Sequence, residues 1–226
     1  MLIKKIASKM NDTILDIYDY SIDKKVCGTS LIKYVPSVFR DDKNGVGSTG
    51  SQSTHYFILS RMFSHVELKE TDSFIDIGCG KGRVLAYLIH KKAPCSLTGI
   101  ELNESVGALA AEWSKKYDNV NIIVDDAFNI GYDDYTVFFM GRPFLPKTFL
   151  QFVEKFESEI THRITLIYWV DQQSGFLLKE RKGWTMNYRE TVYKMYGLHV
   201  AGSPQGYSVW TYDPDARRSS AVKAKK

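Results

Sequence analysis

The strongest constraint on this chain is a glycine-rich stretch in its first half. Residues 74–77 form a short, mainly apolar run that suits a buried parallel strand, and residues 84–89 suit a helix. Between them stand Gly78, Gly80 and Gly82. Glycines let the backbone turn sharply and let a ligand approach the main chain and the positive end of the new helix. We therefore predict a strand, a ligand-binding turn and a helix.

The spacing of these glycines indicates the kind of ligand. A dinucleotide-binding turn needs a glycine where this chain has Arg83, and a phosphate-binding loop needs a Gly-Lys-Ser/Thr sequence that does not occur here. Instead, Asp76 stands at the end of the strand, just before the glycines. A carboxylate at this position repels a pyrophosphate and attracts an ammonium or sulfonium group. The sequence thus predicts a ligand with a positive charge.

An acidic residue followed by glycines at alternate positions resembles the first motif of the class I S-adenosylmethionine-dependent methyltransferases, of the small bacterial type. The resemblance covers most of the chain. It implies that S-adenosylmethionine is the cofactor and that Asp76, Gly78, Gly80 and Gly82 hold its methionine moiety. The alternative is a tight corner without a ligand, for which a single glycine would suffice.

The resemblance also implies an α/β fold. The expected architecture is a Rossmann-like, doubly wound, seven-stranded and mostly parallel sheet with helices on both faces and an antiparallel C-terminal strand pair. Apolar runs and their periodicity supply the remaining elements. We expect strands at 96–101, 120–124, 135–140 and 164–170, helices at 102–116, 145–160 and 174–181, and extended segments at 185–195 and 206–212.

Glu101 is the second candidate ligand. It ends the expected strand 96–101, about 19 residues beyond Gly82. A βαβ unit returns its second strand beside the first, so an acidic residue at that strand end can accept hydrogen bonds from a ribose diol. The alternative is a strand-end charge that faces water.

A third acidic site follows the strand at 120–124. Asp125, Asp126 and Ala127 resemble the family's acidic-alanine motif beside the adenine. The resemblance implies that Asp126 accepts from the adenine amino group and that the backbone at Ala127 faces the ring edge. Asp125 is the competing carboxylate, and Asp126 is preferred because it precedes the alanine.

The acceptor side is predicted at the end of the fourth strand, where Gly141, Arg142, Pro143 and Phe144 follow. Ligands collect at the carboxyl ends of strands in open α/β sheets. Amino-methylating members of the resembled family often have Asn/Asp-Pro-Pro-aromatic or Asn-Pro-Phe here. Arg142 replaces the amide, and a guanidinium only donates hydrogen bonds, so Arg142, Pro143 and Phe144 suit an anionic substrate better than an amino group. The alternative is a surface arginine paired with a carboxylate such as Asp133 or Asp134.

The segment before the glycine turn is expected to cover the core. Residues 1–20 combine an amphipathic start with a more extended part at 14–18, and residues 21–29 loosely resemble an entry segment of certain small bacterial methyltransferases. The polar, glycine-rich residues 41–51 suit a mobile loop that moves on ligand binding.

A helix is expected to begin near Ser53 or Thr54. By resemblance, Thr54 and Tyr56 approach the cofactor. Tyr56, His55 and Arg142 are, in that order, the candidates for a catalytic role at the rim, and no general base is assigned. Alternatively, Tyr56 belongs to the core and His55 to the surface.

Composition narrows the remaining possibilities. A chain of 226 residues with 44% hydrophobic residues suits one structural domain, with an N-terminal cap or lid at 1–70, a cofactor-binding core at 71–213 and a disordered basic tail at 214–226. The net charge is only +4 and the basic residues form no stripe along the sequence, so nucleic acid is not an expected partner. No apolar run approaches the roughly 20 residues of a membrane span, and a cytoplasmic protein is expected. Three scattered cysteines suggest neither a disulfide framework nor a zinc site, and the oligomeric state is not indicated.

The predicted function is transfer of a methyl group from S-adenosylmethionine to an unidentified acceptor, with a protein amine or a small molecule favoured. Catalysis would rest mainly on positioning. The alternative is a regulatory module that binds S-adenosylmethionine without turnover.

Overall fold

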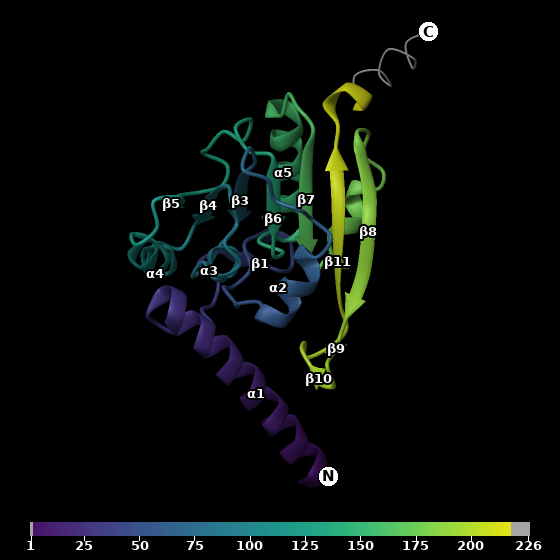
Figure 1. The fold of residues 1–226 in the computed structure, drawn as a ribbon. Coiled ribbons are helices and arrows are strands. Elements are labelled where there is room, and N and C mark those ends of the chain that lie inside the picture. Colours follow the sequence, from purple (N-terminus) through teal and green to yellow (C-terminus); the bar gives the residue numbers. More distant parts are fainter. Residues whose placement is uncertain (1, 218–226) are drawn as a thin grey trace.

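A seven-stranded sheet runs through the molecule (Figure 1) in the computed structural model, which describes residues 2–217, with side chains from residue 10. The strand order is β5-β4-β3-β6-β7-β11-β8, and only β11 runs against the others, because it pairs antiparallel with both β7 and β8. The predicted doubly wound, mostly parallel sheet is therefore confirmed. Its strands are β3 (Ser73–Ile77), β4 (Ser96–Glu101), β5 (Val120–Val124), β6 (Val137–Met140), β7 (Ile164–Trp169), β8 (Trp184–Val192) and β11 (Gln205–Tyr212).

The chain reverses direction across the sheet at β3. From β3 it proceeds outward through β4 and β5, then returns to place β6 on the other side of β3. The loops that follow β3 and β6 consequently diverge at the carboxyl ends of neighbouring strands. Such a switch point leaves a crevice in which ligands of open α/β sheets bind.

Two apolar cores lie on opposite faces of the sheet, as the expectation of helices on both faces requires. One core joins β3, β6 and β7 to α1, α2, α3 and Trp113 of α4, and the other joins the same strands to α5. The helices are α1 (Leu2–Cys27), α2 (Tyr56–Phe63), α3 (Arg83–His90), α4 (Glu104–Ser114) and α5 (Pro146–Glu159), with a 3₁₀ turn η1 (Gly175–Leu178) in place of the helix expected at 174–181.

The N-terminal prediction was wrong in one respect. Residues 14–18 are not extended, and residues 21–27 do not form a separate entry segment, because α1 continues to Cys27 and ends at Gly28 in a left-handed conformation with φ 75°. The buried positions follow a helical spacing. Two of them are acidic residues, so the apolar pattern of the sequence is interrupted there. The buried positions are Leu15, Asp19, Ile22, Asp23 and Val26.

A buried ion cluster fixes α1 against the start of α3. Arg83, the first residue of α3, donates from Nη1 to Asp19 (2.9 Å) and from Nη2 to Asp23 (2.7 Å), and all three side chains are buried. Asp23 also accepts from the Tyr56 hydroxyl (2.8 Å) and from the backbone N–H of Leu31 (2.8 Å). The carboxylates are thus fully used, as buried charges must be.

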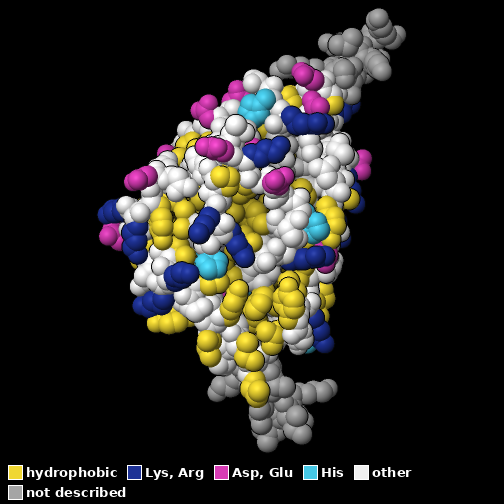
Figure 2. Space-filling view, in the orientation of Figure 1, with side chains coloured by type: hydrophobic (Ala, Val, Ile, Leu, Met, Phe, Trp, Pro, Cys, Tyr) yellow, Lys and Arg dark blue, Asp and Glu magenta, His cyan; other side chains and the backbone are white. Residues whose placement is uncertain are grey.

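The N-terminal part of α1 runs toward the end of the molecule where β9 and β10 lie (Figure 1). The Asn11 amide exchanges two hydrogen bonds with the backbone of His199 in β10 (Leu198–His199), which pairs with β9 (Lys194–Met195). Hydrophobic side chains gather at this end of the molecule (Figure 2). The exposed large hydrophobic residues include Ile14 and Ile17 of α1 and Tyr196 between β9 and β10.

The glycine-rich segment predicted as a loop contains a short hairpin of β1 (Arg40–Asp41) and β2 (Val46–Gly47). Asp41 closes its turn by accepting from the backbone and the side chain of Asn44. At the other end of the chain, residues 214–217 are helical, and the remainder of the predicted basic tail, 218–226, lies outside the described residues. Within residues 2–217, no helix combines the length and the apolar character needed to span a membrane.

The ion cluster predicts a large loss of stability on neutralising one carboxylate. Asp23→Asn should lower the free energy of unfolding in urea by about 3–5 kcal/mol, because the buried Arg83 loses a charged partner. The control is Asp42→Asn, which breaks the exposed pair with Arg40 and should leave the unfolding curve nearly unchanged. Equal effects of the two changes would contradict this interpretation.

Candidate functional site

A cavity of about 640 Å³ opens at the switch point of the sheet. Its floor is the glycine turn and the carboxyl ends of β3 and β4. Its walls are the segment 48–55, the start of the β5–β6 loop at 125–127, the β6–α5 loop at 141–144, and the residues 200–205 at the start of β11. The cavity therefore combines segments from both halves of the chain.

Asp76 is the most unusual group in this cavity. It lies on β3 with only 1% of its surface exposed, and neither carboxylate oxygen has a hydrogen-bond partner among the described residues. Burial, and then the neighbouring charge of Glu101, raise the pKa of Asp76 well above its usual value. A buried carboxylate without a partner is costly, so this site is built for a ligand that supplies a cation or a hydrogen-bond donor.

Glu101 stands beside Asp76, at the end of β4. Its Oε2 accepts from the backbone N–H of Gly80 (2.8 Å), and its Oε1 accepts from the backbone N–H of Asn103 (2.9 Å). Burial raises the pKa of Glu101, and these backbone donors oppose the shift. Each oxygen keeps a further lone pair for a ligand, so Glu101 both shapes the glycine turn and lines the cavity.

The three motif glycines have different tasks. All have positive φ, at 74°, 58° and 84° for Gly78, Gly80 and Gly82. A Cβ on Gly78 would lie 2.6 Å from Pro143, and one on Gly80 would lie 2.5 Å from Ser51. Gly82, in contrast, does not line the cavity, and a Cβ there would meet Trp113 at 2.7 Å. Gly82 therefore allows helix packing, while Gly78 and Gly80 shape the cavity.

The predicted adenine-side residues also lie in the cavity. Asp125, Asp126 and Ala127 all line it. Asp125 is held in its own turn, because its Oδ1 accepts from the Asp126 backbone and from the Asn129 amide. Asp126 uses Oδ1 for the backbone N–H of Phe128.

The predicted acceptor-side residues Arg142, Pro143 and Phe144 line the opposite wall. Among the described residues, no carboxylate lies within 4.0 Å of the Arg142 guanidinium, and Asp133 instead binds Thr161. The surface ion pair considered for Arg142 is thus not formed with Asp133. Arg142 has φ 52°, an unfavourable left-handed conformation for a residue with a Cβ.

A strap from the N-terminal region holds this wall in place. Thr49 donates from its backbone to the Pro143 carbonyl (2.9 Å) and from its hydroxyl to the Arg142 carbonyl (2.7 Å). Leu145 donates in turn to the Gly47 carbonyl. The hydrogen bonds stabilise the unfavourable backbone of Arg142 and connect the predicted lid directly to the β6–α5 loop.

Thr54 and Tyr56, both predicted to approach the cofactor, have different positions in the structure. Thr54 lines the cavity, whereas Tyr56 is not among the lining residues, since its hydroxyl is buried against Asp23. Burial first, and then the Asp23 charge, raise the pKa of Tyr56 far above its usual range. The structure therefore gives Tyr56 a place in the core and removes it from contact with the cavity.

Two further cavity residues have contacts that the sequence did not predict, although His55 was already a candidate for a catalytic role at the rim. His55 lines the cavity and contacts Asp19, a contact with no local signal because 36 positions separate the two residues. Lys81 is almost fully buried and donates to the Lys33 carbonyl. Burial, followed by the charge of Arg83, lowers the pKa of Lys81 to about 8. Its position within the glycine motif was the only hint in the sequence.

The close contact at Gly78 generates a prediction. Gly78→Ala should lower the free energy of unfolding by about 1–3 kcal/mol, because the new Cβ meets Pro143 and the positive φ disfavours alanine. Gly131→Ala is the matched control, since a Cβ at Gly131 meets nothing within 4 Å. Urea unfolding measures both, and an unchanged Gly78→Ala variant would show that the turn tolerates a side chain.

The cavity fits S-adenosylmethionine on these observations alone. The buried Asp76 carboxylate suits its positive charge, Glu101 suits a diol, and the glycine turn leaves the backbone open to a ligand.

Comparison with known proteins supports the same assignment. Residues 74–148, from β3 to the start of α5, match the model of the methyltransferase domain family. A pavine N-methyltransferase from Thalictrum flavum subsp. glaucum is 26% identical over 168 residues, which is 72% of this chain. The match spans only 38% of that relative's length.

Solved structures show the same fold. A methyltransferase from Pyrococcus furiosus has a TM-score of 0.59 and 14% identity, with 89% of this chain and 98% of that chain covered. An O-methyltransferase from Thermotoga maritima has a TM-score of 0.54 and 18% identity, with 72% and 67% covered. These solved structures show that the chain has the fold of class I S-adenosylmethionine-dependent methyltransferases, and residues 74–148, which contain the acidic-glycine motif, match the methyltransferase domain model.

Proposed function

We propose that this chain transfers a methyl group from S-adenosylmethionine to a nitrogen or oxygen of an acceptor that carries a carboxylate or phosphate. The observation that carries the anionic acceptor is Arg142, which lines the cavity and whose guanidinium has no carboxylate within 4.0 Å among the described residues. A guanidinium presents a fixed fork of donors that suits these anions.

The cofactor would occupy the side of the cavity formed by β3, β4 and the residues after β5. Asp76 would attract its positive charge, Glu101 would accept from its ribose, and Asp126 would accept from its adenine. S-adenosylmethionine supplies a methyl group that its sulfonium already makes electrophilic. The task of the chain is then to align the acceptor and to exclude water, for which the strap at Thr49 closes one side.

A small anionic acceptor is favoured over a protein amine. Arg142 repels an approaching ammonium, and it is half-buried within the cavity instead of lying on an open surface. The N-methyltransferase among the relatives supports a nitrogen as the nucleophile. Nucleic acid is not favoured, since the net charge is only +4. A regulatory module without turnover is the remaining alternative.

The direct test uses S-adenosylmethionine labelled in its methyl group, incubated with the protein and a cell extract. The proposal expects label in small molecules that an anion exchanger retains at neutral pH. Label only in protein would exclude the small acceptor. Binding of S-adenosylhomocysteine without any labelled product would favour the regulatory module.

The unpartnered carboxylate predicts opposite effects on stability and binding. Asp76→Asn should make the ligand-free protein more resistant to urea, because it removes a buried charge, and should weaken S-adenosylmethionine binding by about 1.5–3 kcal/mol. Calorimetry and unfolding curves measure the two effects. The exposed Asp118→Asn change should alter neither.

The raised pKa gives the same prediction a pH dependence. The folded-state pKa of Asp76 lies above its unfolded value, so its contribution to stability is full below the unfolded pKa and is lost as pH rises through the folded pKa. The Asp76→Asn variant should not show this decrease of stability with rising pH. Destabilisation of the ligand-free protein by Asp76→Asn would show that the carboxylate has a partner after all.

If Arg142 contacts the acceptor and not the cofactor, a change at Arg142 should affect methyl transfer but not cofactor binding. Arg142→Ala should leave the affinity for S-adenosylhomocysteine within about twofold and should lower methyl incorporation by roughly 10- to 100-fold, the loss of one charged contact. Arg142→Lys is the matched control, because it keeps the charge but not the fork and should lose less. If the Arg142→Ala variant binds the cofactor weakly but keeps its rate at saturating cofactor, Arg142 contacts the cofactor and not the acceptor.

A further inference from the structure

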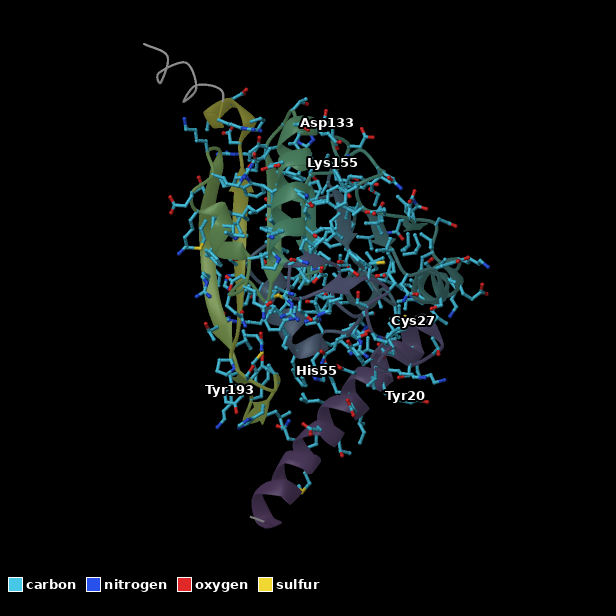
Figure 3. The ribbon with its side chains drawn as sticks, turned by 180° about the vertical axis from the view of Figure 1, so that it is seen from behind. Tyr20, Cys27, His55, Asp133, Lys155 and Tyr193 are labelled. Atoms are coloured by element: carbon cyan, nitrogen blue, oxygen red, sulfur yellow. The ribbon has the colours of Figure 1, made fainter. Side chains whose placement is uncertain are left out.

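His55 is held in the cavity by a carboxylate that belongs to the buried ion cluster. It precedes α2, its side chain is 30% exposed, and its Nδ1 lies 2.6 Å from Asp19 Oδ2. Figure 3 shows His55 beside α1, at the start of α2. Its other ring nitrogen, Nε2, has no hydrogen-bond partner among the described residues.

The surroundings of Asp19 determine which ring nitrogen carries the proton. Asp19 is fully buried and also accepts from the Tyr56 backbone N–H (3.1 Å) and from Arg83 Nη1 (2.9 Å). A carboxylate surrounded by donors is an acceptor, so the remaining contact makes His55 Nδ1 the protonated nitrogen. The lone pair of the neutral ring is consequently on Nε2.

We propose that His55 is the general base of this enzyme and that Asp19 is the residue that positions it. The proposal rests on the function proposed above. An N–H or O–H bond of the acceptor breaks, and its proton goes to Nε2 of His55. The freed electron pair forms the bond to the methyl carbon, and the electron pair of the broken carbon–sulfur bond stays on sulfur.

The charged neighbours of His55 favour this role. Asp19 faces it from α1, Arg83 lies behind Asp19 at the start of α3, and Lys81 lines the same cavity from the glycine turn. When His55 takes up the proton, the resulting imidazolium is in contact with a buried carboxylate. Arg83 holds that carboxylate in place, which leaves Asp19 little freedom to turn away.

The base narrows the acceptor class. A nucleophile that is already deprotonated at neutral pH, such as a carboxylate, needs no base. An amine, a phenol or an alcohol does. Combined with Arg142, His55 points to an acceptor that carries one such group together with a separate anionic group.

Lys81 is the rival base in the same cavity. Its pKa is lowered to about 8 by burial and by Arg83, so a neutral amine is accessible to it. Its Nζ, however, donates to the Lys33 carbonyl, which favours the protonated ammonium. A base role for Lys81 would place the rise of the rate near pH 8 and would not depend on His55.

The first test needs no acceptor. Nitrogen-15 spectra of the histidine side chains in the ligand-free full chain, assigned with a His55→Gln variant, report which ring nitrogen of neutral His55 carries the proton. The expected result is a proton on Nδ1 and a bare Nε2, with the pattern disturbed by Asp19→Asn. A proton on Nε2 would overturn the proposal whatever the behaviour of the variants.

The second test follows methyl incorporation from labelled S-adenosylmethionine into the cell extract across pH. His55→Gln should lower the rate by about 10²- to 10⁴-fold and remove the rise of the rate with pH, while S-adenosylhomocysteine binding stays within about twofold. The matched control is His162→Gln. His162 also lies beside an aspartate, Asp133, but Figure 3 places Asp133 at the end of the molecule opposite His55.

The outcomes separate the two proposals. A wild-type protein that labels nothing ends the methyl-transfer function, and the base with it. An active wild type with an equally active His55→Gln variant ends the base alone. A rise with pH that survives in His55→Gln and disappears in Lys81→Met would transfer the role to Lys81.

Discussion

The position of the N-terminal helix depends on the guanidinium of Arg83. This side chain bridges Asp19 and Asp23 of α1 at the point where α3 leaves the glycine turn, with almost no exposure to water. Asp19 then orients His55, and Asp23 fixes Tyr56 and the backbone at Leu31. A break in one ion pair would leave a buried charge without a partner and would release several cavity walls together. The cluster therefore couples the fold of the N-terminal segment to the geometry of the site.

Two features of the cavity, at Asp76 and Arg142, lower the stability of the ligand-free chain at positions suited to ligand binding. Asp76 is buried without a partner and lies close enough to Glu101 for that charge to raise its pKa. Arg142 has an unfavourable backbone conformation, and Thr49 holds it by donating to the carbonyls of Arg142 and Pro143 in the β6–α5 loop. Both features cost free energy in the ligand-free chain, and both are located where ligands would bind. The sheet and its two apolar cores supply the stability that tolerates them.

Much of the fold and part of the site could be predicted because their signals are local. The run before Gly78, the acidic residue that ends β4 and the acidic residues after β5 identified the strand ends, and Asp76, Glu101, Asp126 and Arg142 all line the cavity. The prediction failed where a tertiary contact replaced the usual pattern. Asp19 and Asp23 interrupt the apolar stripe of α1 because they are buried ion partners, so the helix was partly read as extended. Tyr56 resembled a ligand residue, yet its hydroxyl turns to Asp23.

The sequence by itself determined most of the order of strands and helices, the glycine turn and the resemblance to methyltransferases, because each rests on the spacing of neighbouring residues. Only the tertiary structure decided which groups meet in the cavity. His55 and Asp19 are 36 positions apart, Arg83 and Asp23 are 60, and Thr49 and Arg142 are 93. No periodicity connects such pairs, since their contact depends on how α1 and the strap pack over the finished sheet. His55 was a candidate from the sequence, but its contact with Asp19 could be recognised only in the folded chain.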